Sequence, residues 1–266
     1  MYTADRGSGP PVLLIHGQPG SHWDWEALSS RLESSHRVVA PDRPGYGATG
    51  GAALGLAANA DALVGLLDQV GLSAATVVGH SLGGGVALAL AQRHPERVSG
   101  LVLVASIGTV AGLGNLDRFL ALPRVGEAMA FAALALAGRL VPHLQRRPPT
   151  HVPRRLGVLV AGWPAAWLGA DQLRCEQGRA WRSFAVEQRT MLAEVPALEA
   201  GLGKVRAPTT VVAGGRDRVV PAVVARDLTR AIPTAVLHVV PGVGHFLPLE
   251  APDQLAEVVR HQTVRP

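Results

Sequence analysis

The most informative segment of the sequence is A-T-V-V-G-H-S-L-G-G-G-V-A-L-A-L-A-Q-R, residues 75–93. Its first four residues form a short apolar run, which is typical of a buried strand. The residues that follow place Leu82, Val86 and Leu90 on one face of a helix. Between strand and helix lies G-H-S-L-G, whose two glycines allow a sharp turn that lifts Ser81 above the sheet. The stretch therefore predicts a serine nucleophile at a helix N-terminus.

Two other interpretations of this turn were weighed. A glycine-rich turn whose serine only caps the helix is the alternative for Ser81. A dinucleotide-binding fingerprint is excluded, because Ser81 occupies the place of the middle glycine in the G-x-G-x-x-G pattern.

Short apolar runs of the same kind alternate with helix-like segments along the chain. The predicted strands are Val12–Ile15, Arg37–Ala40, Ala75–Val78, Leu101–Ala105, Thr209–Ala213 and Ala235–Val240. These runs lack polar alternation, which is typical of parallel strands covered by helices on both faces. The chain is therefore expected to be an α/β protein with a mostly parallel β-sheet flanked by helices.

One long interval, between the strands Leu101–Ala105 and Thr209–Ala213, breaks this alternation. It is too long for a structureless loop in a compact domain, and it contains several apolar blocks of helical appearance. We expect a helical cap or lid inserted at residues 107–203, with residues 1–106 and 204–266 forming the core domain.

The composition excludes several classes of protein. The chain has 266 residues, of which 48% are hydrophobic and 17% charged, so it can bury a core and is not a disordered tail. A lone cysteine, Cys175, excludes an internal disulfide and a cysteine-based metal site. Neither a metal nor a cofactor is expected.

The basic charge is a weak signal for a nucleic-acid partner. The formal net charge is +5, but of 25 Lys and Arg residues only Lys204 is lysine, which suggests a compositional bias. The densest basic stretch, residues 139–155, has no interleaved aromatic residues and matches no nucleic-acid motif. No nucleic-acid partner is expected, and whether this stretch binds an anionic ligand stays open.

The sequence favours a cytoplasmic protein. Its first ten residues lack the apolar segment of a signal peptide. Its longest uncharged apolar stretches, Ala128–Gly138 and Leu156–Ala170, are shorter than the roughly 18 residues of a membrane span. We expect a monomer or homodimer without a membrane span.

A serine needs a base, and the base needs an acidic partner. His245 follows the last predicted strand, at the sheet edge where parallel sheets carry their chemistry. Asp217 follows the strand Thr209–Ala213 in a similar loop. A loop histidine packed by Phe246 and a surface ion pair at Asp217 are the alternatives. The three candidates occur along the chain in the order Ser81, Asp217, His245, and each of them follows a different predicted strand.

The segment H-G-Q-P-G, residues 16–20, follows the first strong strand. Acyl transfer needs backbone N–H groups aimed at the developing oxyanion. We expect these donors to be the N–H groups of Gln18 and Leu82, with the Gln18 side chain adding polarity. His16 is expected to hold the loop and not to act as a second base.

These segments resemble the α/β-hydrolase fold superfamily, in particular its members with a helical cap. The matching motifs are H-G-Q-P-G, D-R-P-G-Y-G, G-H-S-L-G-G, G-G-R-D-R-V-V-P and G-V-G-H-F-L-P-L-E-A-P, all outside the predicted cap. The resemblance implies a triad of Ser81, Asp217 and His245, an oxyanion hole at Gln18 and Leu82, and a substrate pocket between core and cap.

Two departures from the family pattern affect the interpretation. The chain before Val12 is short, so the usual first strand is expected to be missing and the second reduced to about Tyr2–Asp5. Relatives that open epoxides or cleave carbon–halogen bonds carry aspartate at the position of Ser81. The serine disfavours both activities, because they need a carboxylate nucleophile.

The predicted function is a cofactor-independent serine hydrolase that cleaves carboxylic esters of small molecules through an acyl-enzyme. On the same triad, hydrolysis of a carbon–carbon bond in a diketone, lactone hydrolysis and haloperoxidase-like peracid formation stay open. A ligand receptor or binding protein without turnover is the alternative of a different class.

The predicted substrate pocket uses four aromatic residues. Leu156–Ala170 is uncharged and contains Trp163 and Trp167. We expect part of this stretch to line the acyl pocket beside Trp23 or Phe246. The alternative is that the two cap tryptophans only join the cap helices to each other.

Overall fold

The structure is a computed structural model that describes residues 1–132, 136 and 180–264. Trp163, Trp167, Cys175 and the basic stretch 139–155 lie outside the described residues. The predictions made for them stay predictions.

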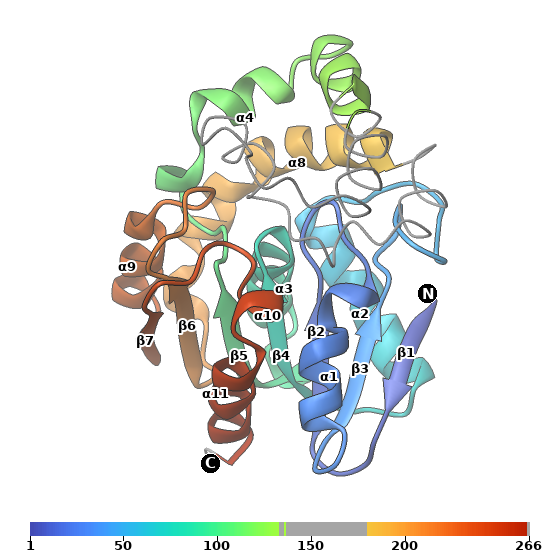
Figure 1. The fold of residues 1–266 in the computed structure, drawn as a ribbon, viewed down its shortest axis with the longest axis vertical. Coiled ribbons are helices and arrows are strands. Elements are labelled where there is room, and N and C mark those ends of the chain that lie inside the picture. The colour runs from blue at the N-terminus through green and yellow to red at the C-terminus, as the bar shows by residue number, and fades with distance from the viewer. Residues whose placement is uncertain (133–135, 137–179, 265–266) are drawn as a thin grey trace, which may run out of the picture.

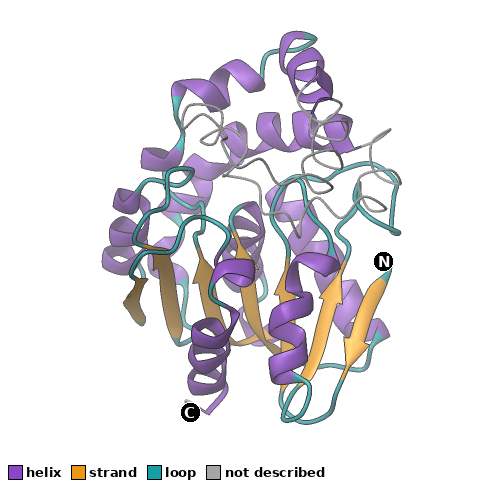
Figure 2. Cartoon of the chain, in the orientation of Figure 1, coloured by secondary structure: helices purple, strands orange, loops and turns teal. Residues whose placement is uncertain are grey.

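A seven-stranded sheet in the order β1-β3-β2-β4-β5-β6-β7 forms the centre of the molecule (Figures 1 and 2). The strands are β1 Thr3–Arg6, β2 Pro11–Ile15, β3 Arg37–Pro41, β4 Ala75–His80, β5 Val98–Val104, β6 Thr209–Gly214 and β7 Ala235–Val240. Strand β1 runs antiparallel to β3, and the remaining pairs are parallel. The expected mostly parallel α/β sheet is confirmed.

Among the predicted strands, only Ala235–Val240 has the same ends in the structure, and the others differ by one to three residues. The first lies at Thr3–Arg6, one residue later than the predicted Tyr2–Asp5, and pairs Thr3 with Pro41 and Arg6 with Val38. The strand predicted at Leu101–Ala105 spans Val98–Val104. Ala105 falls outside because its φ of 45° is left-handed and breaks the extended conformation.

Helices cover both faces of the sheet, which explains the uninterrupted apolar strands. On one face, α1 (Glu26–Leu32) and α11 (Pro252–Val264) pack over Val12 and Leu14. On the other face, α2 (Leu56–Gln69), α3 (Leu82–Arg93) and α9 (Ala222–Ala231) pack over strand residues that include Leu13 and Ile15. Successive side chains of a strand point to opposite faces, so β2 needs apolar residues throughout.

The described residues between β5 and β6 are mainly helical. They include a short 3₁₀ turn at Val110–Gly112, α4 (Asn115–Leu120), a helix at 125–132 and α8 (Ala180–Ala200). Helices α4 and α8 lie over the edge of the sheet at which the parallel strands end (Figure 1). The C-terminal part of α8 joins the main core through Met191, Val195 and Leu198. The division into core and cap stays a prediction.

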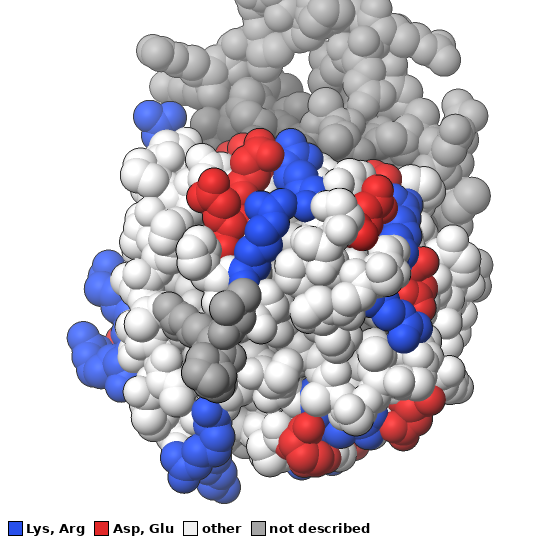
Figure 3. All heavy atoms as spheres, turned by 90° about the horizontal axis from the view of Figure 1, so that it is seen from below, with Lys and Arg blue, Asp and Glu red and all other residues white. Residues whose placement is uncertain are grey.

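The opposite end of the molecule carries charges of both signs. Figure 3, the view from below, shows Lys and Arg side chains beside Asp and Glu side chains, separated by uncharged surface. Among the described residues visible there, no extended basic surface forms.

Candidate active site

Ser81 lies in a tight turn between β4 and α3. Its φ of 55° and ψ of −120° are rare for a residue with a side chain. The Ser81 N–H donates to the Val104 carbonyl at 2.9 Å, which fixes the turn to β5. A Cβ atom on Gly79 would lie 2.7 Å from Gly84 Cα, so this turn requires glycine at position 79. The predicted strand-turn-helix context of Ser81 is confirmed.

The structure brings Ser81, His245 and Asp217 into one hydrogen-bonded row. His245 Nε2 lies 3.1 Å from Ser81 Oγ, and His245 Nδ1 lies 2.9 Å from Asp217 Oδ2. Only 7% of the His245 side chain and 6% of the Asp217 side chain are exposed. The three residues come from loops after β4, β7 and β6, as the parallel sheet predicts.

The position of Asp217 determines which nitrogen of His245 can accept a proton. A carboxylate only accepts hydrogen bonds, so the Nδ1 atom of His245 must carry the hydrogen that faces it. The lone pair on Nε2 then faces the hydroxyl of Ser81. Asp217 is itself held, because its Oδ1 accepts the N–H groups of Val219 at 2.8 Å and Val220 at 3.0 Å. The arrangement can remove the proton of Ser81 during nucleophilic attack.

Two further side chains, those of His80 and Glu250, hold the main chain around His245. This role was not predicted from the sequence for either residue. His80 donates from Nε2 to the His245 carbonyl at 2.9 Å. The Glu250 carboxylate, in α10 (Leu247–Glu250), accepts the N–H groups of Gly244 at 2.9 Å and Phe246 at 3.2 Å. Burial lowers the pKa of His80 to about 3, so this imidazole is neutral at neutral pH.

The predicted oxyanion loop lies against the nucleophile turn. A Cβ atom on Gly17 would lie 3.1 Å from Ser81 Cβ, so the two loops are in close contact. His16 is fully buried, and its burial lowers its pKa well below the usual value. It holds the loop, as predicted, since its Nε2 accepts the Arg43 N–H at 2.9 Å and its Nδ1 lies 2.8 Å from the Gly17 carbonyl.

The side chain of Gln18 is engaged elsewhere. Its Nε2 donates to Gln188 Oε1 of α8 at 2.8 Å, and Gln188 Nε2 donates to Asp117 Oδ1 of α4 at 3.3 Å. The prediction that this side chain adds polarity at the oxyanion was therefore incomplete, because it joins the loop to the overlying helices. The backbone N–H groups of Gln18 and Leu82 remain the candidate donors, Leu82 as the first residue of α3.

The described members of the predicted pocket lie near histidine rings. The Phe246 ring packs edge-on against His245 with a centroid distance of 5.3 Å. Trp23 is about half exposed, and its ring packs against that of His22 with a centroid distance of 4.9 Å. Trp163 and Trp167 lie outside the described residues.

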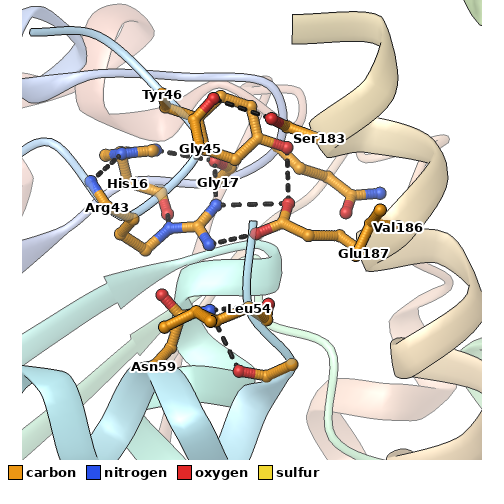
Figure 4. Close-up of polar contacts among 12 residues, drawn as sticks. His16, Gly17, Arg43, Gly45, Tyr46, Leu54, Asn59, Ser183, Val186 and Glu187 are labelled. Carbon is orange, nitrogen blue, oxygen red and sulfur yellow. Dashed lines mark hydrogen bonds and ion pairs between the residues drawn. The ribbon is translucent and has the colours of Figure 1, made fainter. Parts of the chain in front are cut away.

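A buried ion pair between Arg43 and Glu187 was not anticipated from the sequence (Figure 4). Arg43 belongs to the D-R-P-G-Y-G motif that follows β3, whereas Glu187 lies in α8. No local signal in the sequence identified this pair, because Arg43 follows Asp42 in the motif and charged residues of this kind are mostly exposed. Burial raises the pKa of the Glu187 carboxyl, and hydrogen bonds from Arg43 and Tyr46 oppose that shift.

The described residues contain neither a metal-binding cluster nor a helix that could span a membrane. None of the groups of His, Cys, Asp and Glu found there could hold a metal ion. No helix in that part of the chain has the length and apolar character needed to cross a membrane.

Comparisons with known proteins agree with this fold. The family model described as alpha/beta hydrolase fold matches residues 10–252. A 2-hydroxymuconate semialdehyde hydrolase of Pseudomonas putida is 30% identical over 282 residues, which cover 97% of this chain and 88% of that protein.

Two solved structures are also similar. A meta-cleavage product hydrolase from Pseudomonas fluorescens IP01 matches with a TM-score of 0.69 and 25% identity, over 97% of this chain and 92% of its own. A thermophilic esterase from Thermogutta terrifontis matches with a TM-score of 0.71 and 24% identity, over 98% of this chain and 91% of its own, which supports the fold alone.

Proposed function

This chain is a hydrolase of the alpha/beta hydrolase family, and we propose that it cleaves carboxylic esters with Ser81 as the nucleophile. One observation carries the proposal: the continuous hydrogen-bonded row from Ser81 Oγ through His245 to Asp217, at 3.1 and 2.9 Å. Such a row activates a hydroxyl that is otherwise a poor nucleophile at neutral pH.

The first half of the proposed reaction forms an acyl-enzyme. Ser81 Oγ attacks the ester carbonyl while His245 Nε2 takes the serine proton, and the N–H groups of Gln18 and Leu82 bind the oxyanion. The tetrahedral adduct collapses as the bond to the alkoxide breaks, and His245 gives its proton to the leaving oxygen. The alcohol departs, and the acyl group stays on Ser81.

The second half returns the enzyme to its starting state. His245 takes a proton from water as that water attacks the acyl carbonyl. When the second adduct collapses, His245 protonates Ser81 Oγ and the carboxylic acid is released. Asp217 stabilises the imidazolium in both halves without itself becoming protonated.

Hydrolysis of a carbon–carbon bond is the second candidate, because the relatives include semialdehyde and meta-cleavage product hydrolases. Two further relatives are named for dienoate substrates, which are carboxylates. Arg43, a buried cation beside the oxyanion loop, is already paired with Glu187 and with main-chain carbonyls. This arginine is not free to bind a substrate carboxylate, so it gives the second candidate no support.

The test compares both substrate classes on the same preparation. p-Nitrophenyl esters of increasing acyl length and a 2-hydroxy-6-oxo-dienoate are assayed with the wild type and with Ser81→Ala. We expect higher kcat/KM for the esters and a fall in kcat of roughly 10³–10⁶-fold in Ser81→Ala. Faster turnover of the dienoate would assign the second candidate instead. Ester activity within tenfold of wild type in Ser81→Ala would remove Ser81 as the nucleophile.

A burst of p-nitrophenol in the first turnover tests whether the protein is an enzyme or only a binding protein. An acyl-enzyme that forms faster than it hydrolyses releases one equivalent rapidly, whereas a binding protein releases none. Fluorophosphonates are expected to label Ser81. Haloalkanes are expected to release no halide, because serine does not supply the carboxylate nucleophile that this reaction needs.

The acyl pocket is proposed to include Phe246 and Trp23 from the core and Trp163 and Trp167 from the inserted segment. Replacing a pocket residue by Ala should change the preference between short and long acyl chains by about 1–3 kcal/mol. A residue that only joins helices should instead lower the melting temperature and leave that preference unchanged.

A further inference from the structure

The Arg43 guanidinium connects the oxyanion loop to helix α8 (Figure 4). Its Nε donates to the His16 carbonyl at 3.0 Å, and its Nη2 donates to the Gly17 carbonyl at 2.8 Å. Its Nη1 pairs with Glu187 Oε1 on α8. Arg43 is 0% exposed and Glu187 is 1% exposed, so water does not compete for either group.

The hydrogen bond to the Gly17 carbonyl orients the neighbouring N–H group. The carbonyl of Gly17 and the N–H of Gln18 belong to one peptide unit, and the bond between them is trans. In a planar trans peptide the two groups point in opposite directions. A donor that fixes the Gly17 carbonyl therefore fixes the direction of the Gln18 N–H.

His16 supplies a second donor to the same carbonyl. Its Nε2 accepts the main-chain N–H of Arg43, so the hydrogen of His16 is on Nδ1. Nδ1 lies 2.8 Å from the Gly17 carbonyl oxygen. Arg43 thus acts twice on this peptide unit, directly through Nη2 and indirectly through the tautomer of His16.

Glu187 keeps Arg43 in this position. A buried guanidinium without a counter-ion would be strongly destabilised and would turn toward water. The second oxygen of Glu187 accepts the Tyr46 hydroxyl at 2.6 Å, which holds the carboxylate in place. One turn earlier in α8, Ser183 Oγ donates to the Gly45 carbonyl at 2.7 Å. Helix α8 is therefore anchored to the D-R-P-G-Y-G loop at two points.

We propose that Glu187 is a positioning residue for hydrolysis: through Arg43 it orients the Gln18 N–H toward the oxyanion, so that full activity requires α8 to be seated on the core. This inference rests on the proposed function of Ser81 and Gln18. Loss of one oxyanion donor typically lowers kcat by about 10²–10³-fold. We expect a donor that points in the wrong direction to lower kcat by about 10–10²-fold.

The first experiment compares Glu187→Gln with Glu194→Gln. Glu194 lies on the same helix and accepts the Ala57 N–H at 2.9 Å, so it also joins α8 to the core, but it does not contact the oxyanion loop. The measurements are kcat, KM and the inhibition constant of a trifluoromethyl ketone, which forms an oxyanion on the nucleophilic serine and mimics the transition state.

We expect Glu187→Gln to lower kcat by about 10–10²-fold and to leave KM within about threefold of the wild-type value. The inhibition constant of the ketone should rise by the same factor by which kcat/KM falls. Glu194→Gln should leave kcat and ketone inhibition at wild-type values. Wild-type ketone inhibition in folded Glu187→Gln would overturn the proposal. Equal losses in both variants would also overturn it, because they would indicate a general loosening of α8.

A double variant, Arg43→Met with Glu187→Met, covers the case in which Glu187→Gln does not fold. It removes both charges together, and replacement of a buried pair by apolar residues of similar size is often tolerated. The double variant should retain a melting temperature near that of the wild type and still lose ketone affinity. Wild-type ketone affinity in the double variant would overturn the proposal.

Fluorophosphonate labelling separates failure of this inference from failure of the proposed function. If wild-type Ser81 is not labelled, the proposed function fails. If wild-type Ser81 is labelled and Glu187→Gln is labelled at the same rate, this inference alone fails.

Discussion

His80 and His245 are joined by a hydrogen bond of 2.9 Å from His80 Nε2 to the His245 main-chain carbonyl. The residue just before the nucleophile therefore holds the loop that carries the base, and their rings lie with centroids 4.9 Å apart. Because Nε2 must donate to the carbonyl, the single ring hydrogen of neutral His80 is on Nε2. Burial disfavours the charged form of His80 and is the main reason why its pKa is lowered, and the neighbouring His245 lowers it further.

Replacing His80 should reduce the sensitivity of the fold to acid. The pKa of His80 is about 3 in the folded chain, and histidine in an unfolded chain has a pKa of about 6.5. Between these values the unfolded chain binds the extra proton, so the free energy of unfolding falls as pH decreases, by up to about 1.4 kcal/mol per pH unit. His80→Gln removes this contribution while it keeps a donor side chain.

Urea unfolding at pH 4, 5, 6, 7, 8 and 9 provides the measurement. The wild type should lose more stability than His80→Gln between pH 6 and pH 4, and the two slopes should agree above pH 7. Parallel curves over the whole range would show that His80 does not titrate as inferred.

Asp217→Asn should lower kcat by about 10⁴-fold and leave the protein folded. The asparagine amide can donate to Nδ1, which moves the imidazole hydrogen to Nε2 and leaves no lone pair facing Ser81. Steady-state kinetics on an ester give the size of the loss. Asp227→Asn in α9 is the control, because Asp227 makes only a surface pair with Arg230 at 3.1 Å. Loss in the control and not in Asp217→Asn would show that the acid is misassigned.

Glu250→Ala should lower kcat by about tenfold with little change in melting temperature. Its carboxylate accepts the N–H groups on both sides of His245, so its loss lets the imidazole move relative to Ser81. Asp253→Ala is a matched control, since Asp253 is also exposed and, among the residues that the structure describes, pairs with Arg31 and not with the His245 loop. An equal kcat in the two variants would exclude a positioning role for Glu250.

Gly65→Ala should stabilise the fold by about 0.5–1 kcal/mol. Gly65 lies inside α2 with negative φ, and a Cβ atom there would meet nothing within 4 Å. Gly71 just after α2 has equal space but a φ of 72°, so Gly71→Ala should destabilise by about 1 kcal/mol. The midpoints of urea unfolding measure both changes. A destabilised Gly65→Ala would show that space and helix propensity are not sufficient at this position.

Much of this architecture is encoded locally and could be predicted. Apolar runs such as Val12–Ile15 predict strands buried on both faces, and the structure has β2 at Pro11–Ile15 with its alternate residues in two separate cores. The turn at Ser81 is also local, because Gly79 allows the close approach that the turn requires. Asp217 and His245 could be placed at one sheet edge since the carboxyl ends of parallel strands meet there.

The remaining contacts depend on which residues meet across long distances in the chain, and local patterns do not specify such pairs. Arg43 and Glu187 are 144 residues apart, and either one alone resembles an ordinary surface charge. His80 could be predicted on the nucleophile turn, but its bond to the His245 carbonyl exists only once β4 and the loop after β7 lie together. The sheet, the nucleophile turn and the candidate triad could thus be predicted from local sequence patterns. The buried charges and carbonyls that hold these parts in position could not. Burial makes an unpaired polar group costly, so each of these groups has a partner, and only the folded chain determines which partner is within reach.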